Sequence, residues 1–512
     1  MVAKIKTFAF NGINALPVDV QVKISSGKSL FTIVGLPDKS VGESKERVRG
    51  AITSSGLSWP FEKITVNLAP ADLQKEGGHF DLAIALGIMV EIGVISQELV
   101  NKYFVMGELS LDGSINSVSG IISSAISANQ YNCGLICPAV NGKEAVWAGD
   151  IEVIASPDII SLVNHLKGTQ ILNRPENNFS NNQFIHDNNY PDFSDVKGQE
   201  SAKRALEISA CGGHNILMIG SPGTGKSMLA SRLPSILPDL DLMEILEINM
   251  IASVSDKIND GKLIISRPFR EVHHSCSMSA MVGGGVKAKP GEVSFAHRGV
   301  LFLDELAEFP RQVLDSLRQP LESGEVNISR ANSCAKYPAD FQLVCAMNPC
   351  RCGNLGDPSK ECKRAPACGE EYKNKISGPL LDRIDIVVEV ARFDYFIDNN
   401  NFKSSSSIES SAEIKERVIN VREIQKKRFT NYKEFTEIPM LNSKIFGKWL
   451  EFFCKIDDQS KKILENFVTK NKTSIRGISR ILRVARTIAD MDFAESISTK
   501  HLLEAISYRR KI

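Results

Sequence analysis

This sequence of 512 residues lacks long apolar runs, and it lacks an excess of charge of either sign. Its N-terminal residues, MVAKIKTFAFNG, contain no continuous apolar segment of the kind that a signal peptide needs. The most apolar stretch, Phe80–Ile95, carries Asp81 and Glu91 and is too short to span a bilayer. The net charge of +1 argues against polyanion binding over the whole surface, but not against a local basic patch. We therefore expect a cytoplasmic protein with no membrane partner.

The sequence also lacks the features of a protein that reads base sequence. Aromatic residues make up 7% of the chain, and there is neither a helix-turn-helix signature nor an interleaved aromatic stack, so any DNA contact should be independent of base sequence. No solenoid repeat is visible. Eleven cysteines occur without a secretory signal, so we expect reduced thiols, and a tight cluster of them favours a metal site over disulfides.

Length and composition indicate an α/β multidomain protein of roughly three domains. Residues 1–167 alternate short strands and helices, which predicts a domain with its own core. A hairpin turn is expected at Asp112-Gly113. The expected strands are Lys63–Ala69, Phe104–Leu111, Ile115–Val118, Gly134–Cys137 and Ile151–Ala155, and the expected helices are Phe80–Ile92 and Ser119–Gln130.

Two polar segments divide the chain into three parts. Residues 168–191 are rich in asparagine and are predicted to be a linker. In residues 192–397 strands alternate with helices, beginning with a helix at Ser201–Cys211, which predicts a parallel sheet. Residues 398–412 are a second low-complexity linker. Residues 413–512 are predicted to be helical and carry 22 lysines and arginines against 13 acidic residues.

A glycine-rich loop follows an apolar run, Ile216–Ile219, that predicts a short buried strand. The loop GSPGTGKS has the pattern G-x-x-x-x-G-K-[ST] of a phosphate-binding loop, in which glycines let backbone N–H groups surround a polyphosphate at a helix N-terminus. A chance glycine-rich turn is the alternative, and the strand and helix context argues against it. We expect Lys226 at the β- and γ-phosphates and Ser227 on Mg²⁺. The full set of expected ATP ligands is Gly220, Ser221, Pro222, Gly223, Thr224, Gly225, Lys226, Ser227 and Met228.

Two carboxylates end a second apolar strand, at Val300–Leu303. Asp304 is expected to hold Mg²⁺, and Glu305 to orient and polarise the attacking water. Paired acids at a strand end are weak evidence alone, but downstream of a phosphate loop they indicate hydrolysis. A third strand, Phe341–Met347, ends at Asn348, which is expected to bond the γ-phosphate or the water, with a turn asparagine before proline as the alternative.

Two arginines are candidates for contact with the nucleotide. Arg383 lies between carboxylates in LLDRID, where a local salt bridge is one interpretation and an arginine finger that reaches a neighbouring subunit is the other. In the C-terminal helices, Arg476, Arg480 and Arg483 recur at helical spacing and share a face. We expect Arg476 to close over the nucleotide, and the other two are compatible with a solvated basic face.

Four cysteines fall within nineteen residues directly after Asn348. Four thiolates suit a closed tetrahedral Zn²⁺ site, and a metal would offset the entropy of ordering a loop with few apolar residues. The spacing is looser than that of paired C-x₂-C motifs, and reduced cysteines in an irregular insertion are the alternative. The predicted ligands are Cys350, Cys352, Cys362 and Cys368.

Lys287 and Lys289 lie in a glycine-rich segment, MVGGGVKAKPG, between the phosphate loop and the paired acids. Such a segment suggests a mobile loop that lines a ring pore and contacts DNA phosphates without reading sequence. A solvated turn is the alternative. His273 and His274 are expected to be a structural pair packed under this loop, and a role as ligands or sensors is the alternative.

Together these motifs resemble AAA+ ATPases, and more closely the magnesium-chelatase-like branch called the YifB or ComM family. The resemblance covers nearly the whole chain and implies an ATP-driven ring, a hexamer, which in ComM is a DNA motor that moves branch points during natural transformation. Spacing alone predicts only an ATPase. The segments that carry the resemblance are Val34–Val48, Asn67–Ile88, Pro268–Leu306, Ile376–Ile386 and Arg480–Met491.

Residues 1–167 also resemble the ribosomal S5-like domain that carries the Ser–Lys peptidase site of Lon-type proteases. Where that loop supplies the serine, this sequence has Lys75–Phe80, KEGGHF, without one. Simple alignment places Ile122 where the lysine would be. Because the mechanism needs both the nucleophile and its base, we expect no peptidase activity. His79 and Asp81 are expected to be turn and helix-cap residues and not catalysts. The domain is expected to serve in ring assembly or in guiding DNA.

The resulting expectation is a motor on branched or single-stranded DNA, built from an inactive Lon-like domain, an ATPase core and a helical lid. The expected cofactors are ATP and Mg²⁺. The expected partners are DNA and further copies of this chain. One alternative is a magnesium-chelatase-type subunit that remodels a partner enzyme, which the Lon-like domain and the lack of an integrin-type domain argue against. The other is a non-enzymatic scaffold, which the complete set of ATPase residues argues against.

Overall fold

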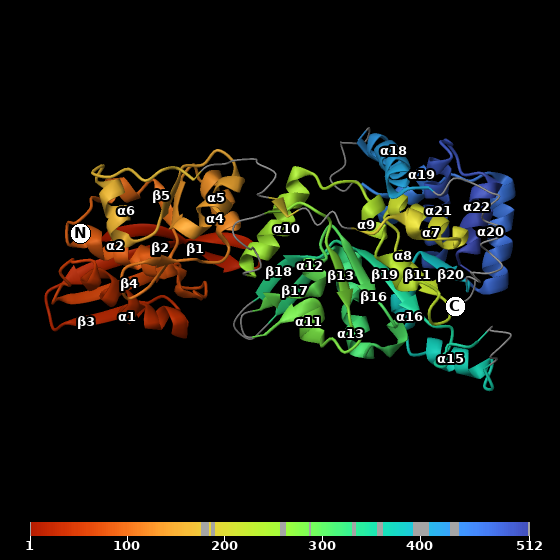
Figure 1. Cartoon of the computed structure of the whole chain (residues 1–512), viewed down its shortest axis with the longest axis horizontal. Helices are drawn as coiled ribbons and strands as arrows, with labels where there is room; N and C mark the ends of the chain where they lie inside the picture. Colours follow the sequence, from red (N-terminus) through yellow and green to blue (C-terminus); the bar gives the residue numbers. More distant parts are fainter. Residues whose placement is uncertain are drawn as a thin grey trace.

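A computed structural model describes residues 2–175, 184–185, 190–255, 263–285, 288–329, 334–355, 362–392, 409–430 and 440–509. Figure 1 shows three regions along the long axis: the N-terminal residues at one end, a sheet with its helices in the middle, and the C-terminal helices at the other end. Among the described residues, none of the helices is both long and apolar enough to cross a membrane.

The N-terminal region is built on a seven-stranded sheet in the order β3-β4-β2-β1-β5-β8-β9. The strands β1 and β2 form a long antiparallel hairpin, whereas β1, β5, β8 and β9 run parallel. The buried helix α2 packs on β1 and β2. The bounds are β1 Ala3–Asn11, β2 Asn14–Ser25, β3 Leu30–Val34, α1 Lys39–Ser54, β4 Lys63–Ala69, α2 Asp81–Glu91, α3 Gln97–Val100, β5 Tyr103–Val105, β6 Glu108–Leu109, β7 Ile115–Asn116, α4 Ile121–Gln130, β8 Gly134–Pro138, α5 Gly142–Ala145, β9 Val153–Ser156 and α6 Ile159–Leu166.

The predicted strand over 104–111 is two strands. The first, β5, ends at Val105 inside the main sheet, and the second, β6, pairs with β7 across the predicted turn at Asp112-Gly113. The chain leaves the sheet at Gly107, whose N–H donates to the His79 carbonyl at 3.0 Å. A side chain there would collide with Leu82 and Ile115, since a Cβ would lie 2.9 and 2.8 Å from their methyl carbons.

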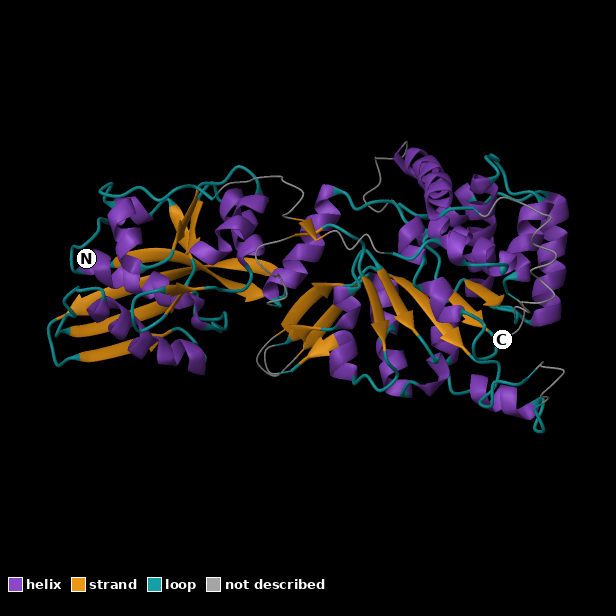
Figure 2. Ribbon diagram, viewed as in Figure 1, coloured by secondary structure: helices purple, strands orange, loops and turns teal. Residues whose placement is uncertain are grey.

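The central sheet has five parallel strands in the order β13-β16-β19-β11-β20. Helices lie on both faces of this sheet in Figure 2, which explains why every residue of β16 and β19 is buried. The bounds are α7 Glu200–Gly212, β11 Ile216–Ile219, α8 Lys226–Ala230, α9 Leu233–Ile236, α10 Leu242–Val254, β12 Leu263–Ile264, β13 Phe269–Val272, α11 Met278–Val282, β14 Gly283–Gly284, β15 Lys289–Pro290, α12 Glu292–Phe295, β16 Val300–Leu303, α13 Arg311–Ser316, α14 Arg318–Ser323, β17 Glu325–Ser329, β18 Cys334–Pro338, β19 Gln342–Met347, α15 Ala367–Lys373, α16 Gly378–Leu381 and β20 Ile386–Glu389; a two-residue strand, β10 Phe184–Ile185, pairs with β12.

The C-terminal helices share one apolar core with the central region. Residues of α7, β11 and β20 belong to the same buried cluster as residues of α18, α21 and α22. The buried His214 links the two parts, because its ring bonds Asp385 at 3.1 Å and Thr487 of α21 at 2.8 Å. The helix α18 starts at Ser411, inside the linker predicted over 398–412, and residues 398–408 lie outside the described residues. The bounds are α18 Ser411–Thr430, α19 Lys448–Phe453, α20 Asp458–Asn471, α21 Ile475–Met491 and α22 Thr499–Ser507.

The N-terminal region meets the centre mainly through α4 and α10. The Gly120 N–H donates to the Ser253 carbonyl at 3.1 Å, and the Ser253 hydroxyl donates to Glu144. The β1–β2 turn also lies close to β18, where the Lys336 carbonyl faces Gly12. The glycine is needed there because a Cβ would lie 2.0 Å from that oxygen.

Candidate active site

The glycine-rich loop runs from β11 into α8, at the carboxyl edge of the central sheet. Gly223 and Gly225 have φ values of 78° and 88°, a region that glycine enters without steric cost. Gly220 has no room for a side chain, since a Cβ would lie 2.5 Å from the Val390 carbonyl oxygen. The Ser221 carbonyl accepts from the Thr224 hydroxyl at 3.0 Å, which closes the turn. Open parallel sheets bind ligands at this edge.

Lys226 lies at the start of α8 with its side chain buried against the loop. Its Nζ donates to the carbonyls of Gly220 at 2.8 Å and Ser221 at 3.0 Å. Burial lowers the pKa of this ammonium group, and the charges of Asp304 and Glu305 oppose the change. The ammonium therefore stays close to the acids across the loop, where it can neutralise a phosphate.

Asp304 and Glu305 follow β16 directly, as the sequence predicted. The Ser227 hydroxyl donates to Asp304 Oδ2 at 2.7 Å, so the hydroxyl and the carboxylate expected to share Mg²⁺ are in contact. These oxygens are the ligand type that Mg²⁺ prefers. Glu305 is exposed and has a φ of 52°, which turns the chain sharply after the strand, and its N–H donates to Asp304 Oδ1 at 2.8 Å.

Asn348 follows β19, which lies between β16 and β11 in the sheet. Its side-chain oxygen accepts from Lys226 Nζ at 3.2 Å. One cavity of about 380 Å³, a size in the range of small-ligand sites, therefore brings together residues that are far apart in sequence. Its lining consists of Pro222, Gly223, Gly225, Lys226, Ser227, Met228, Asp304, Glu305, Met347 and Asn348.

His274 is a neighbour of the acids that the sequence did not reveal. Its Nδ1 lies 3.4 Å from Glu305 Oε2. Its ring is tilted against that of His273, with the ring centroids 4.0 Å apart, and meets Phe309 edge-on. The prediction of a structural pair packed under the glycine-rich loop does not describe His273, which is exposed and bonds Ser275 at 2.9 Å. The only hint in the sequence is that both histidines follow a short strand, β13, which the fold places beside β16.

Arg383 and Arg476 do not lie at the phosphate loop of their own chain. They line a separate cavity of about 700 Å³, together with Arg480 and Arg483 of α21. Arg383 donates to the Pro379 carbonyl at 2.5 Å and pairs with Glu322. This ion pair is not the local one predicted with the flanking carboxylates, since Glu322 is 61 residues away in sequence. The expected shared face of the C-terminal arginines is seen here, although Arg480 is buried and pairs with Asp382 at 3.2 Å.

Some arginine nitrogens at this second cavity have no hydrogen-bond partner. Among the described residues, the buried atoms without one are Arg383 Nε, Arg483 Nε and Arg480 Nη1, whereas Arg480 Nη2 lies 3.2 Å from Asp382. Burial lowers the pKa of Arg383; the Glu322 charge opposes this effect, and the Arg476 charge adds to it. Buried donors without an acceptor are costly, so the cavity is suited to an added anion.

The four predicted metal ligands come together, three from the loop between β19 and α15 and Cys368 from the first turn of α15. Lys289 is exposed in β15 and lines a cavity of about 540 Å³ between the N-terminal region and the centre, together with Glu76 and Tyr337. Lys287 lies outside the described residues. The structure therefore brings the cysteines together but leaves the predicted DNA loop described only in part.

His79 and Asp81 occupy structural positions in the N-terminal region. His79 is buried in a 3₁₀ turn, with Nε2 2.9 Å from the Phe8 carbonyl oxygen. Burial lowers the pKa of this imidazole to about 4. Asp81 is buried at the start of α2 and accepts from Arg47 at 2.5 Å. His79 thus lies in a turn, as expected, but the helix-cap role expected of Asp81 is wrong: Phe80 holds the N-cap position of α2, and the Asp81 carboxylate accepts from Arg47 and from the Leu109 N–H instead.

Comparison with known families gives three matches along the chain. Residues 192–396 match magnesium chelatase, subunit ChlI; residues 20–141 match subunit ChlI of Mg-chelatase; and residues 408–509 match the C-terminal part of magnesium chelatase, subunit ChlI. The first match contains the whole nucleotide cavity and Arg383, whereas Arg476 falls in the third.

Individual relatives cover nearly the full length. The chain is 41% identical to the uncharacterized protein YifB of Escherichia coli over 507 residues, which cover 99% of this chain and 96% of YifB. It is 40% identical to the competence protein ComM of Haemophilus influenzae over 509 residues, 98% of this chain and 96% of ComM. The 38 kDa magnesium-chelatase subunit of Rhodobacter capsulatus is 29% identical over 174 residues, 31% of this chain and 50% of that subunit. The chain therefore belongs to the YifB and ComM family of magnesium-chelatase-like AAA+ ATPases.

Proposed function

We propose that the chain hydrolyses ATP at the cavity beside the glycine-rich loop and acts as a ring of identical subunits that moves DNA. The observation that carries the ATPase part is the convergence of Lys226, Ser227, Asp304, Glu305 and Asn348 on one cavity. An ammonium group, a hydroxyl, two carboxylates and an amide at the end of a phosphate loop are the groups that phosphoryl transfer requires.

Each residue has a role that follows from its position. The backbone of Gly220–Ser227 would surround the phosphates, and Lys226 would leave the loop carbonyls to bond the β- and γ-phosphates. Ser227 and Asp304, already 2.7 Å apart, would hold Mg²⁺, which neutralises charge on the phosphate oxygens when bound. Glu305 would orient the attacking water, and Asn348 would bond the water or the γ-phosphate.

A ring is supported by the separation of the arginines from the loop. Arg383 and Arg476 line their own cavity, in which buried arginine nitrogens lack acceptors. If neighbouring subunits pack head to tail, this cavity would face the triphosphate of the next subunit, and Arg383 would act there as an arginine finger. We propose a hexamer, in which every nucleotide site lies at a subunit interface.

The DNA part of the proposal rests on the family and on charge. A near full-length relative is named a competence protein, and the C-terminal residues 413–512 carry an excess of basic residues. We propose branch migration or helicase activity that supports recombination in natural transformation, with sequence-independent contacts from Lys287 and Lys289. The N-terminal region, without a serine and lysine pair at the peptidase positions, would assist assembly or guide DNA.

The test is the ATPase rate of the purified chain with and without single-stranded and four-way-junction DNA. We expect DNA to stimulate the wild type and Lys226→Ala to abolish the rate in every condition. A further measurement, displacement of a labelled strand from the junction, should depend on ATP. A wild-type ATPase that responds to no DNA would overturn the DNA part and leave the ATPase part standing.

A second candidate is a motor that remodels a protein partner, as a magnesium-chelatase subunit would. It is favoured by one observation: all three family matches are to parts of magnesium chelatase subunit ChlI. An ATPase rate that DNA does not change, but that a co-purified protein partner stimulates, would select this function instead.

A further inference from the structure

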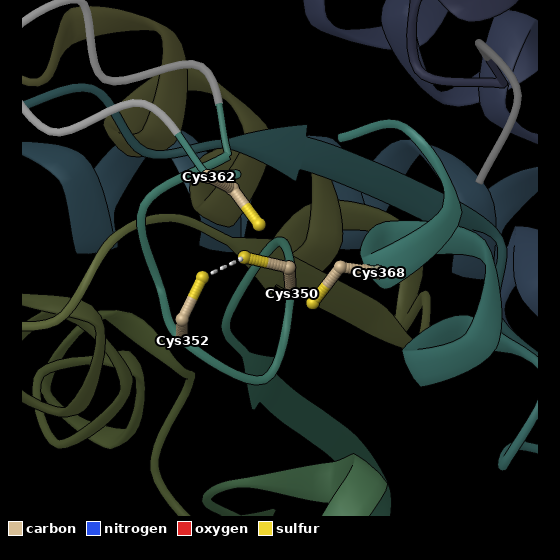
Figure 3. Close-up of side chains that lie close together, drawn as sticks. All are labelled: Cys350, Cys352, Cys362 and Cys368. Atoms are coloured by element: carbon tan, nitrogen blue, oxygen red, sulfur yellow. Dashed lines mark hydrogen bonds between the residues drawn. The ribbon is translucent and has the colours of Figure 1, made fainter. Parts of the chain in front are cut away.

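The loop between β19 and α15, together with the first turn of α15, holds four cysteine side chains in one small space. In Figure 3 the sulfur atoms of Cys350, Cys352, Cys362 and Cys368 turn toward one another from three separate pieces of chain. All four Sγ atoms lie within 4.8 Å of one another, and those of Cys350 and Cys352 are 3.2 Å apart. Three of the four residues are buried, and Cys352 is at the surface.

We propose that these four thiolates bind one Zn²⁺ ion. With Zn–S bonds of about 2.3 Å, the sulfurs of a tetrahedral site lie about 3.8 Å apart, which is between the 3.2 Å of Cys350 and Cys352 and the limit of 4.8 Å that holds for all four sulfurs. Small side-chain rotations are therefore enough to complete the site. A multi-iron cluster fits less well, because its thiolates bind different iron atoms and must lie further apart.

The packing around the cluster argues against ordinary buried thiols. Cys345 and Cys211 lie in large apolar cores, where a reduced cysteine behaves as a small apolar residue. By contrast, Cys350, Cys362 and Cys368 form a separate cluster with Leu355 as its apolar neighbour. A loop with so little apolar surface gains little from burial, so a bound metal supplies the missing reason for its order.

A disulfide does not fit the cluster as well as a metal does. The Sγ atoms of Cys350 and Cys352 are 3.2 Å apart, well beyond the bond length of about 2.05 Å. Disulfides would also divide the four sulfurs into separate pairs, whereas in this cluster all four lie within 4.8 Å of one another. The basic residues Arg351 and Lys363 adjoin the ligands in sequence and would offset the negative charge of a zinc ion bound by four thiolates.

The zinc loop would also support the nucleotide cavity, a consequence that rests on the proposed ATPase function. Cys350 follows Asn348 by two residues, and Gly353 packs on the phosphate loop so closely that a Cβ would lie 2.6 Å from Pro222 Cδ. On the other side, Lys375 after α15 pairs at 3.1 Å with Glu308, three residues beyond Glu305. The metal would thus hold a loop that borders the cavity from two directions.

The test is elemental analysis of the full-length chain, purified with and without zinc in the medium. We expect one zinc per chain in the wild type and loss of that zinc in Cys362→Ser. The matched control is Cys276→Ser, which removes a partly exposed cysteine elsewhere and should retain the metal. Replacement by Co²⁺ should produce the visible absorption of a tetrahedral thiolate site. Folded wild-type protein that contains no metal after zinc loading would overturn the proposal.

A second measurement uses only the wild type and does not require a variant to fold. A thiol reagent should release zinc together with the reaction of four thiols, while circular dichroism reports whether the rest of the chain stays folded. Reaction of those thiols without zinc release would contradict the site. For the support role, the Kd of a fluorescent ATP analogue should rise roughly tenfold when zinc is stripped, the scale seen when residues that support a site are removed. An unchanged Kd would refute the support role alone, and a chain that binds no ATP at all would refute the proposed function but not the metal site.

Discussion

Arg383 provides a decisive test, because its role depends on whether the nucleotide site is shared between subunits. In one chain this arginine lines a cavity separate from the one that holds Lys226. We therefore consider two variants, Arg383→Ala and Lys226→Ala, first alone and then mixed. Alone, each is expected to lose ATP hydrolysis, and the loss of an arginine finger typically costs about a thousandfold in rate, or about 4 kcal/mol in the barrier.

The fold should tolerate the Arg383 change. The side chain loses one hydrogen bond, to the Pro379 carbonyl, and an ion pair with Glu322, whose carboxylate side chain is 58% exposed. Together these contacts contribute about 1–2 kcal/mol, well below the stability expected of a chain of this size. The control Arg311→Ala removes an exposed arginine with a long 3.9 Å contact to Asp315 and should leave the rate unchanged.

Mixing gives the quantitative prediction. A site in a mixed ring is complete where an Arg383→Ala subunit supplies the phosphate loop and its Lys226→Ala neighbour supplies the arginine. With random mixing of equal amounts, this arrangement occurs at about a quarter of the interfaces in a head-to-tail ring. The ATPase rate should therefore rise from the level of either parent toward about a quarter of the wild-type rate.

The assay needs proof that the rings are mixed. Two different affinity tags, with purification on both, select rings that contain both variants, and the rate per subunit is then compared with that of each parent. Two results would refute the reasoning: a rate that stays at the parental level in doubly purified rings, or an Arg383→Ala parent that already hydrolyses ATP within a fewfold of the wild type.

Three further predictions concern single residues. Asn348→Ala removes the acceptor 3.2 Å from Lys226 Nζ and should lower kcat by about a hundredfold with little change in ATP affinity. Separate kinetic and binding measurements test this, and an unchanged kcat would contradict a role of Asn348 in hydrolysis. His274→Ala should raise the ATPase rate without DNA by about two- to fivefold, because it frees the exposed Glu305 from a contact worth less than about 1 kcal/mol. The control His273→Ala should leave this rate unchanged, and equal effects of the two substitutions would show that the contact between His274 and Glu305 does not restrain hydrolysis. His79 stays neutral when folded, since burial lowers its pKa to about 4, but takes up a proton near pH 6.5 when unfolded; stability should therefore fall by about 3 kcal/mol as the pH drops from about 6.5 to about 4. Urea unfolding of the wild type should show this loss of stability at low pH. The variant His79→Gln, which keeps a donor for the Phe8 carbonyl, should lose less stability over the same pH range. Equal pH dependence of stability in the two proteins would contradict the role of His79.

Local patterns predicted the elements that border the nucleotide cavity. The strand at Ile216–Ile219 has the predicted bounds, and so has Val300–Leu303, because each is an apolar run that ends at a residue suited to a turn. The predicted helix at Ser201–Cys211 differs by one residue at each end. Such elements depend on neighbours within a few positions, so a single sequence contains most of the information.

Contacts between distant segments were not predictable in this way. His274 contacts Glu305 only because β13 and β16 are adjacent parallel strands. The sequence of each strand does not specify which other strand lies beside it. The split of the predicted strand over 104–111 has a similar cause, since Gly107 leaves the sheet to bond the His79 carbonyl. Both outcomes depend on long-range packing that overrides local preference.

The sequence by itself determined the chemistry of this protein: a phosphate loop, paired acids, a polar strand end and a set of four cysteines, each readable because its members are close in the chain or follow a known spacing. Only the tertiary structure decided how these parts are distributed. It brought Asn348 to Lys226, gathered the cysteines beside the loop, and placed Arg383 and Arg476 in a cavity away from the phosphate loop of their own chain. The physical reason is that the order of parallel strands and the packing of α21 against the central helices are set by the burial of apolar surface between segments far apart in sequence.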